Sequence, residues 1–133
     1  MPSQKEQQEL MFKLAIYEQQ MKQLQEQFQA VEQAIAETSS LNAGLNELKE
    51  GKDKEIFALI GKGIFAKAKI TSNDLIVDIG SKNFVKKSVA ETQKIIKEQI
   101  QKLEQVKKEL DNKLEELNHE AVKIITEAQE EEG

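Results

Sequence analysis

His119, the one histidine of this 133-residue chain, is the side chain best suited to acid–base or metal chemistry. Three carboxylates, Glu115, Glu116 and Glu120, lie close to it in the sequence. The chain has no cysteine and no second histidine, so a common zinc ligand set cannot be completed. A surface histidine is therefore the favoured interpretation, and we expect neither a metal site nor a catalytic residue.

Gly61-Lys62-Gly63 is the one segment that looks like a phosphate-binding loop. A P-loop needs four residues between its glycines and a serine or threonine after the lysine, and this segment has neither. The sequence also lacks a nucleophile elbow and a dinucleotide-binding fingerprint. We therefore interpret the segment as a tight turn and predict that the chain uses no cofactor, does not use ATP and is not an enzyme.

The charge balance argues against a nucleic-acid partner. The formal net charge is −5, and all 19 basic residues are lysines, so arginine for bidentate phosphate or base contacts is absent. The first residues contain no apolar run typical of a signal peptide, and no stretch approaches the roughly 18 apolar residues of a membrane span. We expect a cytoplasmic protein that binds neither nucleic acid nor membrane.

The elements that must position any binding surface are dominated by helix. Residues 4–50 are predicted to form the first helix, which Ser3 and Glu6 open with a capping-box pattern. Apolar residues then recur at alternating spacings of four and three, which is typical of a coiled-coil seam, the stripe that faces a partner helix. The seam residues are Leu10, Leu14, Tyr17, Met21, Leu24, Phe28, Val31 and Ile35.

After Ile35 the seam is predicted to slip. Thr38 and Asn42 continue the first phase, whereas Leu41, Leu45 and Leu48 fit a phase one residue earlier. Such a slip changes the supercoil locally.

A second helix is predicted over residues 89–131, opened by a capping box from Ser88 to Glu91. Gln93 and Lys107 interrupt its seam with polar side chains, which commonly fix register at a cost in stability. Two helices of equal length should pair antiparallel, with Leu48 near Val89 and residues 10–16 near residues 121–127. The apolar seam residues are Ile96, Ile100, Leu103, Leu110, Leu114, Leu117, Ala121, Ile124 and Ala128.

Residues 54–87 are predicted to form two tandem β-hairpins, because short alternating apolar runs are separated by turn residues. The fold class is therefore α+β, a long antiparallel coiled-coil hairpin with two β-hairpins between its helices, in one domain over residues 1–133. Two hairpins leave sheet edges unpaired, so we expect hairpins of several subunits to assemble into shared β-barrels. The expected oligomerisation residues are Ile64, Phe65, Ala66, Ala68, Ile70, Leu75, Val77 and Ile79.

The two turn segments, residues 57–67 and 76–87, combine with this order of elements into a recognisable plan. The plan resembles the alpha-class subunits of the prefoldin family, the archaeal type in particular. Leu59 stands where the family pattern has proline, and Lys82 stands where it has a second glycine. The residues that fit the pattern are Gly61, Gly63, Phe65, Lys67, Val77, Ile79 and Gly80.

The resemblance implies a hexamer of two such chains with four beta-type prefoldin subunits, which carry one hairpin each. It also implies that unfolded client proteins are held between the helix ends and passed to a group II chaperonin. A structural coiled-coil spacer, or a filament former that grows through the hairpin edges, is the alternative function. Phe65 is expected to pack either between subunits or against helix ends.

At the end of the helical hairpin farthest from the β-hairpins, apolar residues occur outside both seams. An apolar patch beyond the seam can bind exposed apolar segments of a client, and methionine repacks easily for such contacts. The alternative is that these residues fray or dock on a neighbouring helical hairpin. The predicted client-binding residues are Met11, Phe12, Ile16, Val122 and Ile125.

Overall fold

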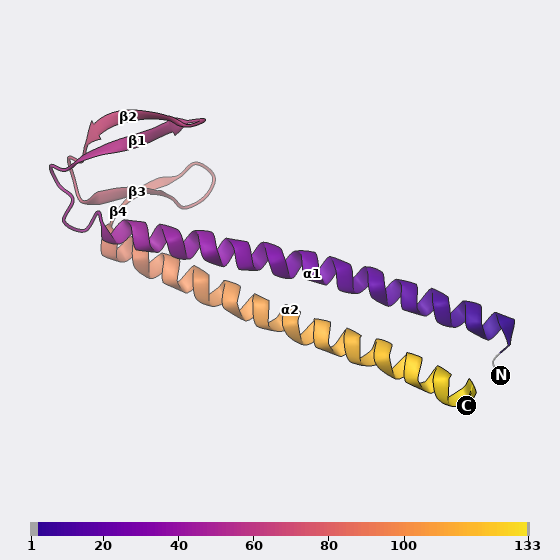
Figure 1. Cartoon of the computed structure of the whole chain (residues 1–133). Helices are drawn as coiled ribbons and strands as arrows, with labels where there is room; N and C mark the ends of the chain where they lie inside the picture. Colours follow the sequence, from indigo (N-terminus) through magenta and orange to yellow (C-terminus); the bar gives the residue numbers. More distant parts are fainter. Residues whose placement is uncertain (1–2, 133) are drawn as a thin grey trace. The chain divides into compact units, whose positions relative to one another are not determined.

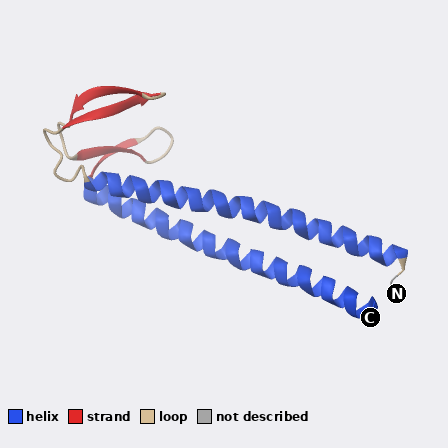
Figure 2. Ribbon diagram, viewed as in Figure 1, coloured by secondary structure: helices blue, strands red, loops and turns tan. Residues whose placement is uncertain are grey.

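The computed structural model describes residues 3–132, and side chains as far as Gln129. Met1, Pro2 and Gly133 of the predicted domain lie outside the described residues. The predicted fold class is confirmed: a long helix, two antiparallel β-hairpins and a second long helix follow one another along the chain (Figures 1 and 2). The elements are α1 (Gln4–Asn46), β1 (Glu55–Gly61), β2 (Ile64–Lys69), β3 (Asp74–Asp78), β4 (Phe84–Ser88) and α2 (Val89–Glu132).

Both helices begin at capping residues. The Ser3 hydroxyl accepts a hydrogen bond from the Glu6 backbone N–H at 3.1 Å, and the Glu6 carboxylate accepts one from the Ser3 N–H at 3.3 Å. Ser88 caps α2 with its hydroxyl, which accepts a hydrogen bond from the Glu91 backbone N–H at 3.1 Å. These bonds satisfy backbone donors that have no partner within the first helical turn.

Helix α1 ends at Asn46, four residues before the predicted position. The chain continues in tighter turns, because the N–H groups of Glu47, Leu48 and Lys49 donate to carbonyls three residues back, at 3.1–3.3 Å. Gly51 is buried where this segment meets the first hairpin, and a Cβ there would lie 3.3 Å from the Ile70 side chain. A glycine after the last turn is the usual way to end a helix.

The chain divides into two compact units. The arm unit contains α1 as far as Ile35 and α2 from Lys102 onward, and the base unit contains residues 36–101. The base unit thus holds both β-hairpins together with the adjoining ends of the helices.

Each hairpin forms a two-stranded sheet of its own. Ala58 pairs with Ala66 in the first sheet, and Val77 pairs with Val85 in the second. In the second turn the Asn83 N–H donates to the Gly80 carbonyl at 2.9 Å, and Lys82 adopts a φ of 61°. This left-handed conformation suits glycine better than lysine.

The core of the base unit is small. Leu45, Val89 and Ile96 are buried together, and Leu48 and Leu75 pack against them. Leu75 brings the second hairpin to the helix ends, and the predicted proximity of Leu48 and Val89 is confirmed.

The predicted slip of the seam is wrong. Leu41 is 55% exposed, whereas Leu45 is only 8% exposed. Leu45 follows Asn42 by three residues, so the first phase continues without a break. The physical reason is that Leu45 is used in the buried cluster with Val89 and Ile96, which leaves Leu41 on the solvent side of α1.

Candidate functional site

In the arm unit, α1 and α2 contact each other in antiparallel order. Tyr17 hydrogen bonds to Glu120, and Lys107 Nζ lies 5.7 Å from the centre of the Phe28 ring. The bond from Tyr17 to Glu120, followed by desolvation and the charge of that carboxylate, raises the pKa of the Tyr17 hydroxyl above its ordinary value. These pairs place the N-terminal end of α1 beside the C-terminal end of α2, as predicted.

The apolar residues predicted to bind client lie at this end of the arm unit, which we call the arm tip, and all five are exposed. Met11 and Phe12 are about 70% exposed, and Val122 is about half exposed. Ile16 and Ile125 are each 42% exposed. Met11, Phe12 and Val122 leave half or more of their surface uncovered, so this apolar surface is free to contact another molecule.

The structure divides the α1 members of this set between different sides of the hairpin. Successive residues of a helix are rotated by about 100°. Met11 follows the seam residue Leu10, and Ile16 precedes the seam residue Tyr17, so they lie on opposite flanks of the seam. Phe12 lies on the back of α1.

The α2 members lie together on one flank, because Val122 and Ile125 each follow a seam residue directly. In an antiparallel pair, flanks of the same rotational sense adjoin, so Met11 shares a side with Val122 and Ile125. An open groove on the other side confirms this arrangement. It is lined by Ile16 with Lys13, Tyr17, Gln20, Leu117, Glu120 and Ile124.

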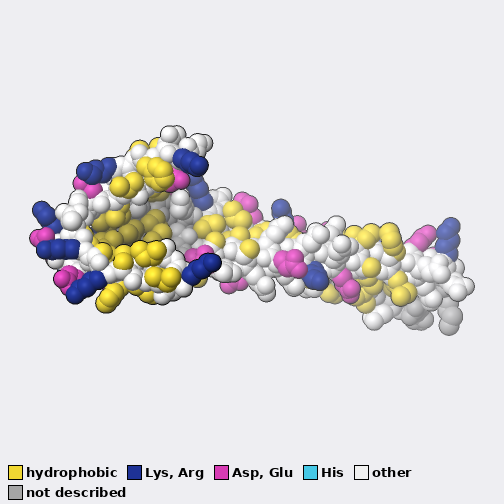
Figure 3. Space-filling model, turned by 90° about the horizontal axis from the view of Figure 1, so that it is seen from above, with side chains coloured by type: hydrophobic (Ala, Val, Ile, Leu, Met, Phe, Trp, Pro, Cys, Tyr) yellow, Lys and Arg dark blue, Asp and Glu magenta, His cyan; other side chains and the backbone are white. Residues whose placement is uncertain are grey.

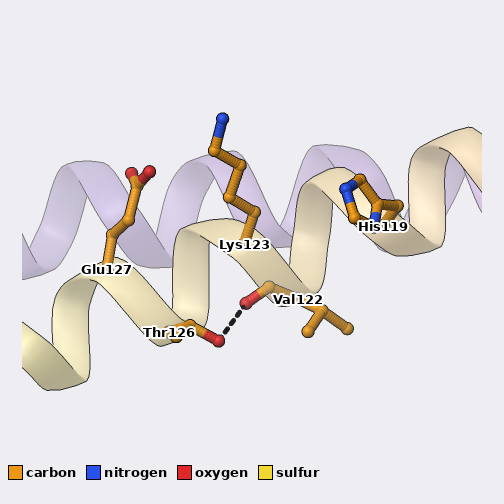
Figure 4. A pocket seen from close by; sticks show the side chains of 5 residues that line it. All are labelled: His119, Val122, Lys123, Thr126 and Glu127. Atoms are coloured by element: carbon orange, nitrogen blue, oxygen red, sulfur yellow. Dashed lines mark hydrogen bonds between the residues drawn. The ribbon is translucent and has the colours of Figure 1, made fainter.

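Val122 belongs to a different groove, which Figure 4 shows along α2. Its backbone carbonyl accepts a hydrogen bond from the Thr126 hydroxyl at 2.8 Å. The other side chains that line it are those of His119, Lys123 and Glu127. His119 thus borders an apolar tip residue, and its neighbours do not form a metal site: among the described residues, no group of three or more His, Cys, Asp or Glu side chains could hold an ion.

The predicted oligomerisation residues fall into two groups. Ala68, Ile70, Leu75 and Val77 are half-buried within the base unit. Ile64, Phe65, Ala66 and Ile79 are exposed, and Phe65 is therefore not covered by helix ends of its own chain.

Sequence reasoning missed the most exposed apolar residues of the hairpins. Phe57 shares an open groove with Phe65, and Leu59 is the direct cross-strand partner of Phe65. Figure 3 shows apolar side chains gathered over the hairpins and again on the helices. Strand alternation puts Phe57, Leu59 and Phe65 on one face of the sheet, but it does not show whether that face is buried. The exposed residues not predicted are Ile56, Phe57, Leu59, Ile60, Ile76 and Phe84.

Cross-strand ion pairs lie beside these exposed apolar residues. Lys67 contacts Glu55 at 3.2 Å in the first hairpin, and Lys86 contacts Asp74 at 3.8 Å in the second. The four side chains are 47–74% exposed, so the pairs add little stability. Within residues 3–132 the structure contains no helix long and apolar enough to span a membrane.

These features define a class of protein: a helical hairpin with exposed apolar residues at its tip, and two β-hairpins whose sheet edges are open. A family model identifies the class further. The model described as prefoldin subunit matches residues 17–132. The chain therefore belongs to the prefoldin family, whose subunits are in general chaperones rather than enzymes.

Curated relatives are alpha subunits from archaeal methanogens. The chain is 38% identical over 90 residues to prefoldin subunit alpha of Methanobrevibacter smithii, covering 66% of this chain and 61% of the relative. It is 28% identical over 79 residues to prefoldin subunit alpha of Methanosphaera stadtmanae, covering 59% and 57%. The matched region thus spans about three-fifths of these relatives' length.

A solved structure supports the fold. The cryo-EM structure of filamentous PFD from Methanocaldococcus jannaschii superposes with a TM-score of 0.75, covering 85% of this chain and 95% of that chain. Sequence identity over this match is 23%, so the likeness concerns the fold alone.

Proposed function

We propose that this chain is a subunit of an ATP-independent holdase, a chaperone that keeps unfolded client proteins from aggregating and passes them to a group II chaperonin in the cytoplasm. The observation that carries the proposal is the exposed apolar surface of the arm tip. Met11 and Phe12 of α1 are each about 70% exposed. Val122 and Ile125 add further exposed apolar surface on α2. Masking apolar segments of a client needs no energy input, because burial of apolar surface is itself favourable.

The assembly we propose is a hexamer of two such chains with four beta-type prefoldin subunits. Each hairpin is a two-stranded sheet with unpaired edges, and such a sheet gains stability when further strands extend it. Residues such as Phe57 and Phe65 supply apolar surface for a shared barrel. Several tips in one assembly would bind a client through avidity, so each tip patch can be small.

The proposal is tested by mixing the chain with a beta-type partner and following the light scattering of a chemically unfolded protein, without ATP. The tip variant carries Met11→Ser, Val122→Ser and Ile125→Ser. Its matched control is Val106→Ser, because Val106 is 41% exposed and lies on α2 outside the tip set. We expect the tip variant to lose most of the protection and the control to keep it, both at unchanged complex mass.

A second variant, Phe12→Ser with Ile16→Ser, assigns the side of the arm that contacts clients. Loss of protection in both variants means that clients wrap the tip. Full protection in both variants, with the complex intact, would refute the tip as the binding site.

A filament former is the second candidate function. Its supporting observations are the open hairpin edges and the fold shared with filamentous PFD from Methanocaldococcus jannaschii. Electron microscopy and mass measurement of the chain alone, over a range of concentrations, separate the two. A polymer that lengthens with concentration favours the filament, whereas a particle of fixed mass favours the closed assembly.

A further inference from the structure

Gln93 is a buried polar residue in a position that an apolar residue should occupy. It is 6% exposed and lies between the buried residues Val89 and Ile96 of the α2 seam. Its side-chain amide donates to the Asn46 side-chain oxygen at 2.8 Å and to the Asn42 backbone carbonyl at 3.2 Å. The Asn42 side-chain oxygen is also buried, and it has no hydrogen-bond partner in the part of the chain described.

This arrangement does not favour stability. The Gln93 amide loses its contacts with water on burial, and the buried side-chain oxygen of Asn42 forms no hydrogen bond within the described residues to replace those it lost. A methionine or leucine at Gln93 would instead enlarge the small cluster around Leu45 and Ile96.

The apolar part of the seam cannot define one pairing of the helices by itself. Leu103, Leu110 and Leu117 recur every seven residues, so a slip of seven residues again places apolar residues against apolar residues. A slip in one direction would bring Asn42 opposite Ile100, and a slip in the other would bring Gln93 opposite Ile35. Either slip takes the Gln93 amide away from the Asn46 side-chain oxygen.

We propose that Gln93 is a positioning residue that fixes the register of α2 against α1. It does so because its amide reaches the Asn46 side-chain oxygen only in the observed pairing; its other acceptor, the Asn42 carbonyl, belongs to the backbone. A buried polar residue that costs stability and excludes other registers is a known device of coiled coils.

The contact of Lys107 with Phe28 supports the same register independently. Lys107 lies 14 residues after Gln93, and Phe28 lies 14 residues before Asn42. Gln93 and Lys107, the two polar residues of the α2 seam, therefore contact α1 in the same register. Since a slip of seven residues displaces one helix by about 10 Å, it would separate Met11 from Val122 and Ile125 at the arm tip.

The register can be measured by electron–electron resonance between two spin labels, because the chain has no native cysteine. The exposed residues Gln25 and Gln129 are changed to cysteine and labelled. In the observed pairing Gln25 faces about residue 110, so the labels are offset by about 28 Å along the helices, and a slip changes this offset by about 10 Å. Labelled chain is diluted into excess unlabelled chain so that only distances within a chain contribute.

The test compares Gln93→Met, which removes the donors at similar volume, with Gln99→Met at an exposed position of the same helix. We expect one narrow distance for the parent chain and for Gln99→Met. Gln93→Met should show a second distance displaced by about 10 Å, together with a higher Tm.

Asn46→Ala provides a second variant that leaves the core untouched, since Asn46 is exposed, and it should broaden the distribution in the same direction. A single unchanged distance in both folded variants would overturn the proposal. Far-UV circular dichroism identifies a variant that has lost its helices, and the other variant then decides.

Discussion

Replacing Leu45 by alanine should destabilise the chain strongly, whereas the same change at Leu41 should not. The two leucines lie four residues apart on α1, and the difference between them is burial: Leu45 is 8% exposed and Leu41 is 55% exposed. Leu45→Ala removes a side chain from the cluster with Val89 and Ile96 and leaves a cavity that a small core can only partly close.

The cost of Leu45→Ala is about 2–3 kcal/mol, at the lower end of buried leucine truncations because the cluster borders solvent. Leu41→Ala should change the free energy of unfolding by no more than about 0.5 kcal/mol, as for most surface substitutions. For a chain of this length, 1 kcal/mol corresponds to roughly 3.5 °C in Tm. Leu45→Ala should therefore lower the Tm by about 7–11 °C.

The assay is thermal unfolding followed by far-UV circular dichroism, at one fixed protein concentration because assembly contributes to stability. Equal losses for the two variants would show that Leu41 also faces α2. That result would refute the continuous seam and restore the slip that the sequence predicted.

Three further predictions concern turns, titration and capping. Lys82→Gly should raise the free energy of unfolding by about 1 kcal/mol in urea denaturation, because Lys82 adopts a left-handed backbone, whereas Lys86→Gly in the neighbouring strand should lower it. Tyr17 should titrate above its ordinary pKa when its absorbance is followed at 295 nm, and Glu120→Gln should reduce the shift. Because the pKa is higher in the folded state than in the unfolded state, this contribution to stability is complete below about pH 10 and is lost as the pH rises through the folded-state pKa. An unshifted titration would disprove the bond between Tyr17 and Glu120. Ser88→Ala should cost about 1 kcal/mol by removing the cap of α2, and an unchanged urea midpoint would contradict that role.

The sequence predicted the elements well because their signals are local. Capping residues, seam spacing and turn residues are short-range patterns: the capping box forms in full at Ser3, the hydroxyl of Ser88 caps α2, and both hairpins form. The phase after Ile35 was mispredicted because Leu45 fits both candidate phases. Only the partner helix resolves the choice, since Leu45 packs with Val89 and Ile96 of α2 and Leu41 stays exposed.

The hairpin surfaces were predicted less completely for a different reason. The predicted residues came from the strands with the clearest alternation, and half of them, such as Leu75, are used within the base unit itself. Phe57 and Leu59 lie in an almost continuous apolar run, where alternation does not show which face is buried. Their exposure follows from the separation of the two hairpins into two sheets, which the sequence does not specify.

The side on which each tip residue lies could have been derived from the sequence. An apolar residue that precedes a seam residue and one that follows it lie on opposite flanks, and this separates Ile16 from Met11, Val122 and Ile125. Because flanks of the same rotational sense adjoin in an antiparallel pair, the separation holds only while the helices keep their register. On our proposal that Gln93 fixes this register, a polar residue that adds no apolar surface itself would maintain the apolar surface proposed to hold clients.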